Sequence, residues 1–298
     1  MNKNKYWNKI IANTSELGAG TKGASLGLQA LQAVDNSFLD SSEIELIKNP
    51  DKDFGTDGLQ KVKRLNSIVK ANKKTCQSVA KTLQNHDRIL LLTGDHSNAI
   101  GGIAGLKKFA QEKTIGVIWI DAHADLHIPD SSPSGNIHGM PLGACLDDGK
   151  KKHSEDWEEI INLSGYCPAL RAENIEFIGI RDLEAIEWQI IQNKKIRYTK
   201  VEEARKIGVN RLAESCLKNL DSTDFIYLSF DVDVLDPSIS KGTGTPVFGG
   251  FSAHEVGQML HVFLQSQKVK VLEITEINPL LDSENRMAKT VNEIMSNL

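Results

Sequence analysis

A short segment from Asp121 to His127 places acidic and imidazole side chains at every second position, as Asp121, His123, Asp125 and His127. A continuous apolar run, "IGVIWI", comes directly before it. Alternation with period two is typical of an extended chain, in which all four side chains share one face. A solvated strand edge is one interpretation. Because crowded carboxylates repel one another unless a cation lies between them, the segment instead favours a cation-binding site.

Ligand-type residues follow four more apolar runs along the chain. "GDHS" follows "RILLLT", "RDLE" follows "NIEFIGI", "DVDVLDP" follows "DFIYLSF" and "EINP" follows "VKVLEIT". Because these runs alternate with segments of helical periodicity, they predict β-α-β units and a parallel sheet flanked by helices. Ligands bind at the carboxyl ends of the strands in such sheets. The acidic and imidazole residues at the predicted strand ends therefore indicate one shared site.

The elements that must position these residues can be placed from the same pattern. We expect strands over residues 6–12, 88–93, 115–120, 174–180, 195–200, 224–230 and 269–275. We expect helices over residues 24–34, 62–83, 99–111, 184–193, 209–220, 252–267 and 285–295, and a solvated loop and helix start over residues 149–160. No repeat, low-complexity tract or long linker divides the chain.

The composition excludes several classes of protein. The chain has 298 residues, of which 40% are hydrophobic and 25% charged, which suits a soluble globular protein with a sizeable core. A net charge of −4 gives no broad basic field for nucleic acid or an anionic membrane. The apolar runs are too short to span a membrane, and the first residues lack the pattern of a signal peptide. The four scattered cysteines indicate reduced thiols in a cytoplasmic protein.

The residue types at the strand ends narrow the choice of metal. The candidates are Asp95, His96, Asp121, His123, Asp125, His127, His138, Asp231, Asp233 and Asp236. Carboxylate and imidazole without thiolate suit Mn²⁺, Fe²⁺, Co²⁺ or Zn²⁺. The aspartates are too numerous for one four-coordinate zinc and suit two ions about 3.5–4 Å apart that share bridging carboxylates. Such a pair makes hydroxide from water and directs it at an electrophilic carbon or phosphorus.

A second motif has a simpler interpretation. "GAGTKG", with Gly18, Gly20 and Gly23, fits the dinucleotide-binding pattern G-x-G-x-x-G, and Asp40 lies about twenty residues further on. A lone fingerprint of this kind is a weak indication of nucleotide binding. We interpret it as a glycine-rich turn between a strand and a helix.

Six motifs together resemble the signature of the arginase family, the ureohydrolases. They are "GDHS", "DAHADLH", "SGNIHGMP", "SFDVDVLDP", "GTGTPVFGG" and "EINP", and they run in family order from Gly94 to Pro279. The resemblance implies a single three-layer α/β/α domain over residues 1–298, with a mainly parallel sheet of about eight strands. It also implies a hydrolase with two Mn²⁺ per chain, whose bridging hydroxide attacks the guanidinium group of L-arginine to give L-ornithine and urea. A homo-oligomer, either a trimer or a hexamer, is implied as well.

The resemblance assigns roles to individual residues. His96, Asp121, Asp125 and Asp231 would hold one ion, and Asp121, His123, Asp231 and Asp233 the other, so that Asp121 and Asp231 bridge. His138 matches the histidine that shuttles protons, although an ordinary loop histidine is the alternative. Glu276 matches the carboxylate that pairs with the guanidinium group. Thr245 would help to shape the pocket, with an ordinary turn threonine as the alternative. Asp236, before Pro237, is expected to shape a turn.

Substrate recognition depends on residues that differ in part from the family pattern. Ser134 and Asn136 match residues that bind the α-carboxylate of arginine. His127 stands where arginases carry an asparagine that touches this carboxylate, and Glu184 stands where they carry an aspartate that meets the α-ammonium. Thr93 replaces the first of two glycines, with little effect expected at a strand end. The sequence therefore predicts L-arginine as substrate.

Three alternatives remain open at this point. An agmatinase or another guanidino-compound hydrolase, acting for example on formiminoglutamate, would share the fold. A metal-dependent deacetylase of related architecture would not be expected to use these aspartates and Glu276 for a cation. A non-enzymatic regulatory relative would have lost metal ligands, and here every ligand of the pattern is present.

Overall fold

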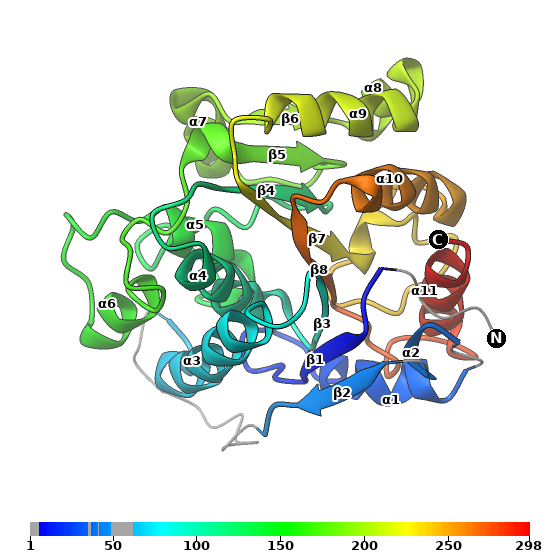
Figure 1. The fold of residues 1–298 in the computed structure, drawn as a ribbon, viewed down its shortest axis with the longest axis horizontal. Helices are drawn as coiled ribbons and strands as arrows, with labels where there is room; N and C mark the ends of the chain where they lie inside the picture. The colour runs from blue at the N-terminus through cyan, green and yellow to red at the C-terminus, as the bar shows by residue number, and fades with distance from the viewer. Residues whose placement is uncertain (1–5, 35–36, 41, 49–61) are drawn as a thin grey trace.

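A single sheet of parallel strands organises the chain (Figure 1). The computed structural model describes residues 6–34, 37–40, 42–48 and 62–298. Within these residues the sheet has eight strands in the order β2-β1-β3-β8-β7-β4-β5-β6. They are β1 (Lys9–Asn13), β2 (Glu43–Leu46), β3 (Ile89–Thr93), β4 (Ile115–Ile120), β5 (Ile175–Ile178), β6 (Arg197–Thr199), β7 (Phe225–Asp231) and β8 (Val269–Thr275). The predicted α/β fold with a parallel sheet of about eight strands is confirmed.

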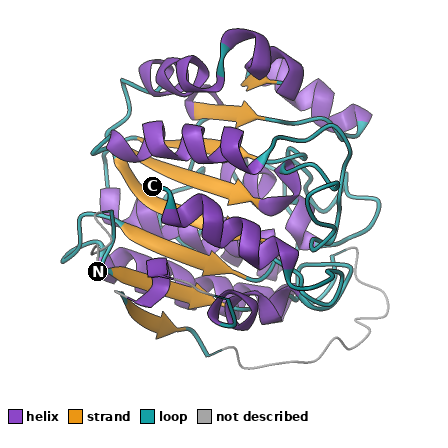
Figure 2. Ribbon diagram, turned by 90° about the vertical axis from the view of Figure 1, so that its right-hand side faces the viewer, coloured by secondary structure: helices purple, strands orange, loops and turns teal. Residues whose placement is uncertain are grey.

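Helices cover both faces of the sheet, as Figure 2 shows. They are α1 (Gly27–Gln32), α2 (Ser37–Asp40), α3 (Leu65–Thr82), α4 (Ala99–Ala110), α5 (Pro141–Leu146), α6 (Glu155–Ile161), α7 (Ala185–Lys194), α8 (Val201–Ile207), α9 (Val209–Asn219), α10 (Ala253–Gln265) and α11 (Arg286–Ser296). Residues of α1, α9, α10 and α11 share one core cluster with the sheet, and residues of α3, α4, α5 and α7 share another. No described helix is both long and apolar enough to cross a membrane.

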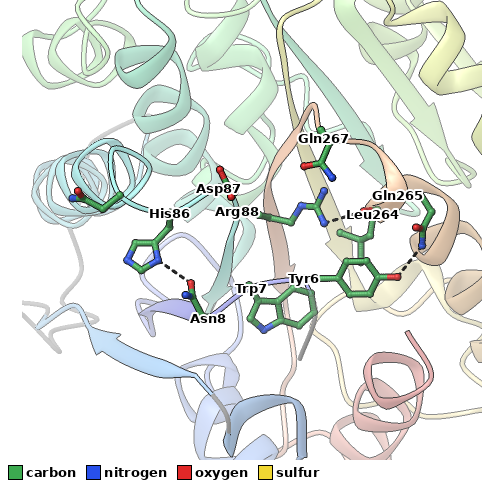
Figure 3. Close-up of a pocket in the computed structure, with 10 residues that line it drawn as sticks. Tyr6, Trp7, Asn8, His86, Asp87, Arg88, Leu264, Gln265 and Gln267 are labelled. Atoms are coloured by element: carbon green, nitrogen blue, oxygen red, sulfur yellow. Dashed lines mark hydrogen bonds between the residues drawn. The ribbon is translucent and has the colours of Figure 1, made fainter. Parts of the chain in front are cut away.

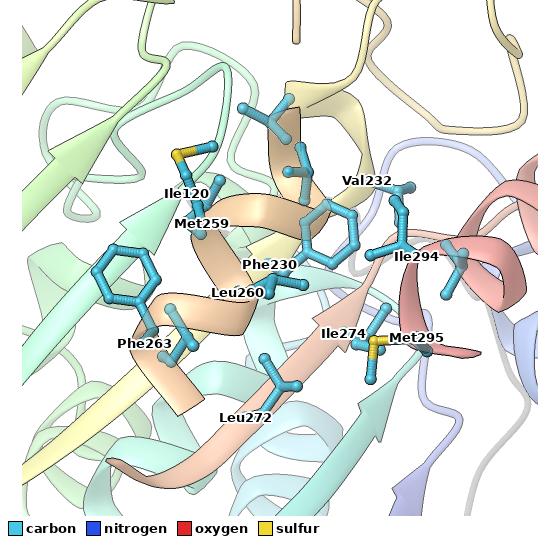
Figure 4. Close-up of a cluster of buried hydrophobic side chains, with 14 of the residues drawn as sticks. Ile120, Phe230, Val232, Met259, Leu260, Phe263, Leu272, Ile274, Ile294 and Met295 are labelled. Carbon is cyan, nitrogen blue, oxygen red and sulfur yellow. The ribbon is translucent and has the colours of Figure 1, made fainter. Parts of the chain in front are cut away.

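Alternation along each strand separates these two cores. In β4, Ile118 and Ile120 belong to the first core, whereas Val117 and Trp119 belong to the second. Successive side chains of a strand point to opposite faces, so an unbroken apolar run supplies both layers. Figure 4 shows the first core, in which Met259, Leu260 and Phe263 of α10 lie against side chains of β4, β7 and β8. The sheet is thereby held between two packed helical layers.

The structure differs from the sequence-based prediction mainly in short elements. The strand β2 was not predicted, because "EIEL" is short and lies half exposed at the edge of the sheet. The helices α2, α5, α6 and α8 span only four to seven residues, which is too short for a clear helical periodicity. The expected helix over 24–34 begins as a 3₁₀ turn, Ala24–Leu26, before α1. The expected helix start near residue 155 is α6, capped by Ser154.

A buried arginine ties the amino-terminal edge of the sheet together. Arg88 lies in a pocket of about 580 Å³ that Tyr6, Gln265 and their neighbours line (Figure 3). Its guanidinium donates to the carbonyl oxygens of Leu264 at 2.9 Å, Ser266 at 2.6 Å and Val269 at 2.7 Å. These bonds join the start of β3 to the turn between α10 and β8. This pocket therefore lies at the amino ends of the strands, and its arginine has a structural role.

We predict that Arg88→Ala lowers the free energy of unfolding by about 2–4 kcal/mol, because it leaves three carbonyl groups without their charged donor. Arg211→Ala is the control, since Arg211 is exposed on α9; it should change the free energy by about 0.5 kcal/mol or less. Urea denaturation of the two variants measures the difference. Equal effects of the two substitutions would contradict the structural role of Arg88.

Candidate metal centre

The structure brings every residue to which the resemblance assigns a metal, catalytic or substrate role to one pocket at the carboxyl ends of the strands, whereas the candidates Asp95 and Asp236 do not line it. This pocket has a volume of about 210 Å³. Its lining includes His96, Asp121, His123, Asp125, His127, Ser134, Asn136, His138, Glu184, Asp231, Asp233, Thr245 and Glu276. The pocket at Arg88 is larger, but ligand-type side chains do not converge in it as they do here. Size alone therefore does not identify the site.

One group of ligands surrounds the imidazole of His96. The Nδ1 atom of His96 lies 3.1 Å from a carboxylate oxygen of each of Asp121, Asp125 and Asp231. All four side chains are buried. His96 begins a 3₁₀ turn directly after β3, and its ring stacks on Trp119 of β4 with centroids 4.0 Å apart. One ring nitrogen and three carboxylates therefore converge on one point.

A second group is built around His123 and shares Asp121 with the first. The Nδ1 atom of His123 lies 3.0 Å from Oδ2 of Asp233 and 3.4 Å from Oδ1 of Asp121. The other oxygen of Asp121 faces His96. Asp121 is thus placed to bridge two ions. Asp231, the second predicted bridge, directs its Oδ2 at His96, and its Oδ1 accepts a hydrogen bond from the backbone N–H of Asp233.

The unsatisfied atoms of these groups fit a divalent cation. Among the described residues, Nδ1 of His96 and Oδ2 of Asp121 are buried and make no hydrogen bond. A buried polar atom without a partner costs free energy, and a carboxylate oxygen facing an imidazole lone pair also repels it. A cation between them would satisfy both atoms. The carboxylate and imidazole donors match the ligands of Mn²⁺ and similar ions.

Burial and mutual repulsion shift the pKa values of the cluster. Burial, with the charge of Asp121, raises the pKa of Asp125 to about 7. Burial and the neighbouring carboxylates of Asp233 and Asp121 raise the pKa of Asp231 well above its usual range. Burial alone would lower the pKa of His96, but the surrounding carboxylates raise it well above its ordinary value. Without a cation, the cluster would therefore retain protons near neutral pH.

The backbone of the opening segment is not the extended strand that its alternation suggested. The strand β4 ends at Ile120, and the ligands lie in the loop that follows. Asp125 has a φ of 52°, which is uncommon for residues other than glycine and is incompatible with a β-strand. Its carbonyl accepts hydrogen bonds from Leu142 and Gly143, in the first turn of α5, which hold the conformation in place. The ligand cluster therefore lies at the end of β4, as predicted, but its alternating residues belong to a loop and not to a solvated strand edge.

His138 and Glu276 lie beside the ligands. The Nδ1 atom of His138 is 3.4 Å from Oε1 of Glu276, and the backbone of His138 donates to the carbonyl of Gly18. Oε1 of Glu276 also accepts a hydrogen bond from the backbone N–H of His96 at 3.0 Å. Burial opposes the charge of His138, but Glu276 raises its pKa above the ordinary value. The "GAGTKG" segment therefore supports the pocket wall.

His127 and Glu184 line the same pocket, together with a residue that the sequence did not single out. The Nε2 atom of His127 is 3.6 Å from Glu184 and 3.7 Å from the buried Glu187. Glu187 accepts hydrogen bonds from the backbone of Leu126 and of Glu184, forming the capping box of α7. The spacing of Glu184 and Glu187 fits the capping-box pattern, which could have revealed this residue. Asp182, whose carboxylate is 3.7 Å from Nε2 of His123, was also missed.

The loop after β7 completes the pocket. Thr245 donates a hydrogen bond from its hydroxyl to Asp233 at 3.0 Å, so it shapes the second ligand group. Asp236 accepts hydrogen bonds from the backbone N–H groups of Ser238, Gly249 and Gly250. A hydrogen bond with the side chain of Ser238, together with these backbone bonds, lowers the pKa of Asp236 to about 2. Asp236 therefore forms a turn, as predicted, and lies outside the ligand groups.

Comparison with known proteins places this geometry in a family. A family model described as "Arginase family" matches residues 10–298. The arginase of Bacillus subtilis is 34% identical, with 97% of this chain and 96% of that protein covered. The arginase of Brevibacillus brevis is 35% identical, with 100% and 98% covered. The solved structure of the arginase of Bacillus caldovelox superposes with a TM-score of 0.85 at 32% identity, covering 97% of both chains.

We predict that a divalent cation raises the melting temperature, and that the rise is larger at about pH 8 than at about pH 6. In the metal-free protein, the folded-state pKa of Asp125 is about 7 against an ordinary value of 3.8. Protonated Asp125 therefore stabilises the metal-free fold at low pH, and this stabilisation is lost as pH rises through about 7. Cation binding requires the deprotonated ligands, so its effect increases over the same range.

Differential scanning calorimetry of chelator-treated protein, with and without Mn²⁺, measures both effects. A larger rise at the lower pH would contradict the assignment of these residues as ligands.

Proposed function

The chain belongs to the arginase family, and on this premise we propose that it hydrolyses L-arginine to L-ornithine and urea with two bound Mn²⁺ ions. The observation that carries the proposal is the pair of ligand groups that share Asp121 and lie in one pocket with Glu276 and His138. A carboxylate for a guanidinium group and an imidazole for proton transfer thus lie beside the cation site.

The ligand groups indicate which residues would hold the ions. His96, Asp121, Asp125 and Asp231 would hold one ion, and Asp121, His123, Asp231 and Asp233 would hold the other. When bound, the ions would activate a water molecule as the nucleophile and stabilise negative charge on the reacting carbon's substituents. Thr245 and the backbone around Asp125 keep the carboxylates oriented.

Glu276 is placed to orient the guanidinium group. Its φ of 66° turns the chain directly after β8, so that the carboxylate lines the pocket. The bond from the backbone of His96 to Oε1 fixes the carboxylate and leaves Oε2 free to pair with a planar cation. The guanidinium carbon is thereby held next to the ligand groups, where proximity and orientation lower the barrier.

His138 is placed to protonate the leaving amine. Its imidazole lines the pocket and contacts Glu276, whose charge raises the pKa of His138 and favours the protonated form. When the bond between the guanidinium carbon and the side-chain nitrogen breaks, the departing nitrogen requires a proton. The imidazolium can supply this proton from the side of the pocket that holds Glu276.

The rim of the pocket supports recognition of an α-amino acid. Ser134, Asn136 and His127 can donate hydrogen bonds to an α-carboxylate, and Glu184 can face an α-ammonium. His127 lies next to Glu184, so it links the two binding regions. Agmatine has the same guanidinium group but no α-carboxylate, which would leave these donors without a partner.

We also propose a cytoplasmic homo-oligomer, either a trimer or a hexamer. The four cysteines are free thiols, which suits a reducing compartment. The oligomer is proposed from family resemblance, and size-exclusion chromatography with light scattering tests it.

We predict that kcat/KM for L-arginine exceeds that for agmatine by at least about 100-fold, because unpaired donors for the carboxylate would oppose agmatine binding. His127→Ala should weaken arginine binding by about 1–3 kcal/mol, which appears as a higher KM for arginine. The same substitution should change the rate of agmatine hydrolysis little. His127→Asn, which keeps a donor, is the matched control. A urea-release assay with Mn²⁺ and arginine, agmatine and formiminoglutamate in parallel measures the preference, and comparable kcat/KM values would refute it.

We predict that His138→Asn lowers kcat by about 10²–10⁴-fold and changes KM much less, because proton transfer to the leaving amine occurs in the transition state. Steady-state kinetics with arginine separate the two constants. Added imidazole should restore part of the rate. An unchanged kcat would leave His138 with a structural hydrogen bond alone.

A further inference from the structure

We propose that Ser229 and Glu273 are positioning residues for His96, forming a buried hydrogen-bonded chain that fixes the orientation and tautomer of its ring and sets its affinity for a divalent cation. The proposal rests on the proposed function in that His96 binds a cation. The inference goes beyond the proposed function because neither Ser229 nor Glu273 lines the pocket. Both lie behind His96, inside the sheet.

The chain runs from the ring of His96 into neighbouring strands. The Nε2 atom of His96 lies 2.7 Å from Oγ of Ser229, and this hydroxyl donates to Oε2 of Glu273 at 2.9 Å. Ser229 of β7 and Glu273 of β8 are paired in the sheet register. Both side chains are fully buried. Tyr227, Ser229 and Asp231 alternate along β7, so the same strand face carries the chain and a cation ligand.

The direction of these hydrogen bonds determines which ring nitrogen carries the proton. Glu273 receives hydrogen bonds from the hydroxyls of Ser229, Tyr227 and Thr93, at 2.9, 2.9 and 2.8 Å. A serine hydroxyl has one hydrogen, and Ser229 directs it to Glu273. Toward His96 it can therefore only accept, so the proton of the neutral ring lies on Nε2. The lone pair of Nδ1 is left facing the three carboxylates, as cation binding requires.

The orientation of the ring is fixed in the same way. The ring of His96 stacks on Trp119 with an interplanar angle of 5°, which sets its plane, and Ser229 sets its rotation within that plane. His123 is held differently. Its Nε2 lies 3.7 Å from Asp182, whose side chain is 68% exposed. The structure therefore gives only the His96 group a buried anionic support of this kind among the two histidine ligands.

Thr93 belongs to this chain. The residue departs from the glycine of the family pattern, and little effect was expected from its position at a strand end. Its buried hydroxyl donates to Oε1 of Glu273, the oxygen that Ser229 and Tyr227 do not contact. The threonine thus supplies a donor to a carboxylate that lies inside the sheet, where an unpaired oxygen would cost free energy.

The test is Mn²⁺ binding to the full-length chain, measured by competition with a chelator of known affinity. Glu273→Gln and Ser229→Ala should each lower the affinity for one of the two Mn²⁺ ions by about 10- to 100-fold. The double variant should lose no more than the larger single effect, because both residues act through one chain. Glu176→Gln is the matched control, since Glu176 is a buried carboxylate of β5 that pairs with Arg197 away from the site. It should leave both affinities unchanged.

A second pair of variants separates positioning from folding. Thr93→Val removes the hydroxyl with little change of shape and should lower the affinity for the same Mn²⁺ ion by about 3- to 10-fold. Thr93→Ser keeps the hydroxyl and should retain the wild-type affinity. Circular dichroism confirms that each variant is folded. Wild-type Mn²⁺ affinity in folded Glu273→Gln and Ser229→Ala would overturn the inference and leave the proposed function intact. A wild-type chain that binds no Mn²⁺ would overturn the proposed function itself, and the inference with it.

Discussion

Repulsion among buried carboxylates is the constraint on which the site depends. Asp121, Asp125 and Asp231 converge within 3.1 Å of one imidazole nitrogen, inside a pocket wall that excludes most water. Such a cluster is unfavourable when all its members are charged. Only bound protons or cations can offset the repulsion. Because the ligands must be deprotonated to bind a cation, cation binding would displace the protons that the cluster otherwise holds.

The fold supplies the rigidity that this cluster requires. Strands β3, β4, β7 and β8 are neighbours or near neighbours in the sheet, so their carboxyl ends deliver His96, Asp121, Asp231 and Glu276 to one edge. Two apolar layers hold the strands in register. The positive φ angles of Asp125 and Glu276 show that the backbone is strained where the chemistry is placed. Hydrogen bonds from α5 and from His96 maintain that strain.

The sequence predicts most of this architecture, and its failures have physical reasons. Long apolar runs such as "IGVIWI" identify buried strands, whereas the short, half-exposed β2 has no comparable pattern. The pocket residues could be named because their motifs are contiguous. Ser229 begins the motif "SFDVDVLDP" and Glu273 lies within the apolar run "VKVLEIT", but no sequence pattern shows that they meet, because their contact arises from the register of β7 on β8. The end of the strand at Ile120 was predicted, but the turn at Asp125 was not, since its conformation depends on contacts with α5.

We propose that two cations complete this site. Titration of chelator-treated protein with Mn²⁺, following bound metal and urea release from L-arginine in the same samples, tests it most directly. We expect activity to reach its maximum only when two equivalents per chain are bound. Full activity with one equivalent, or activity that survives complete removal of the metal, would contradict it.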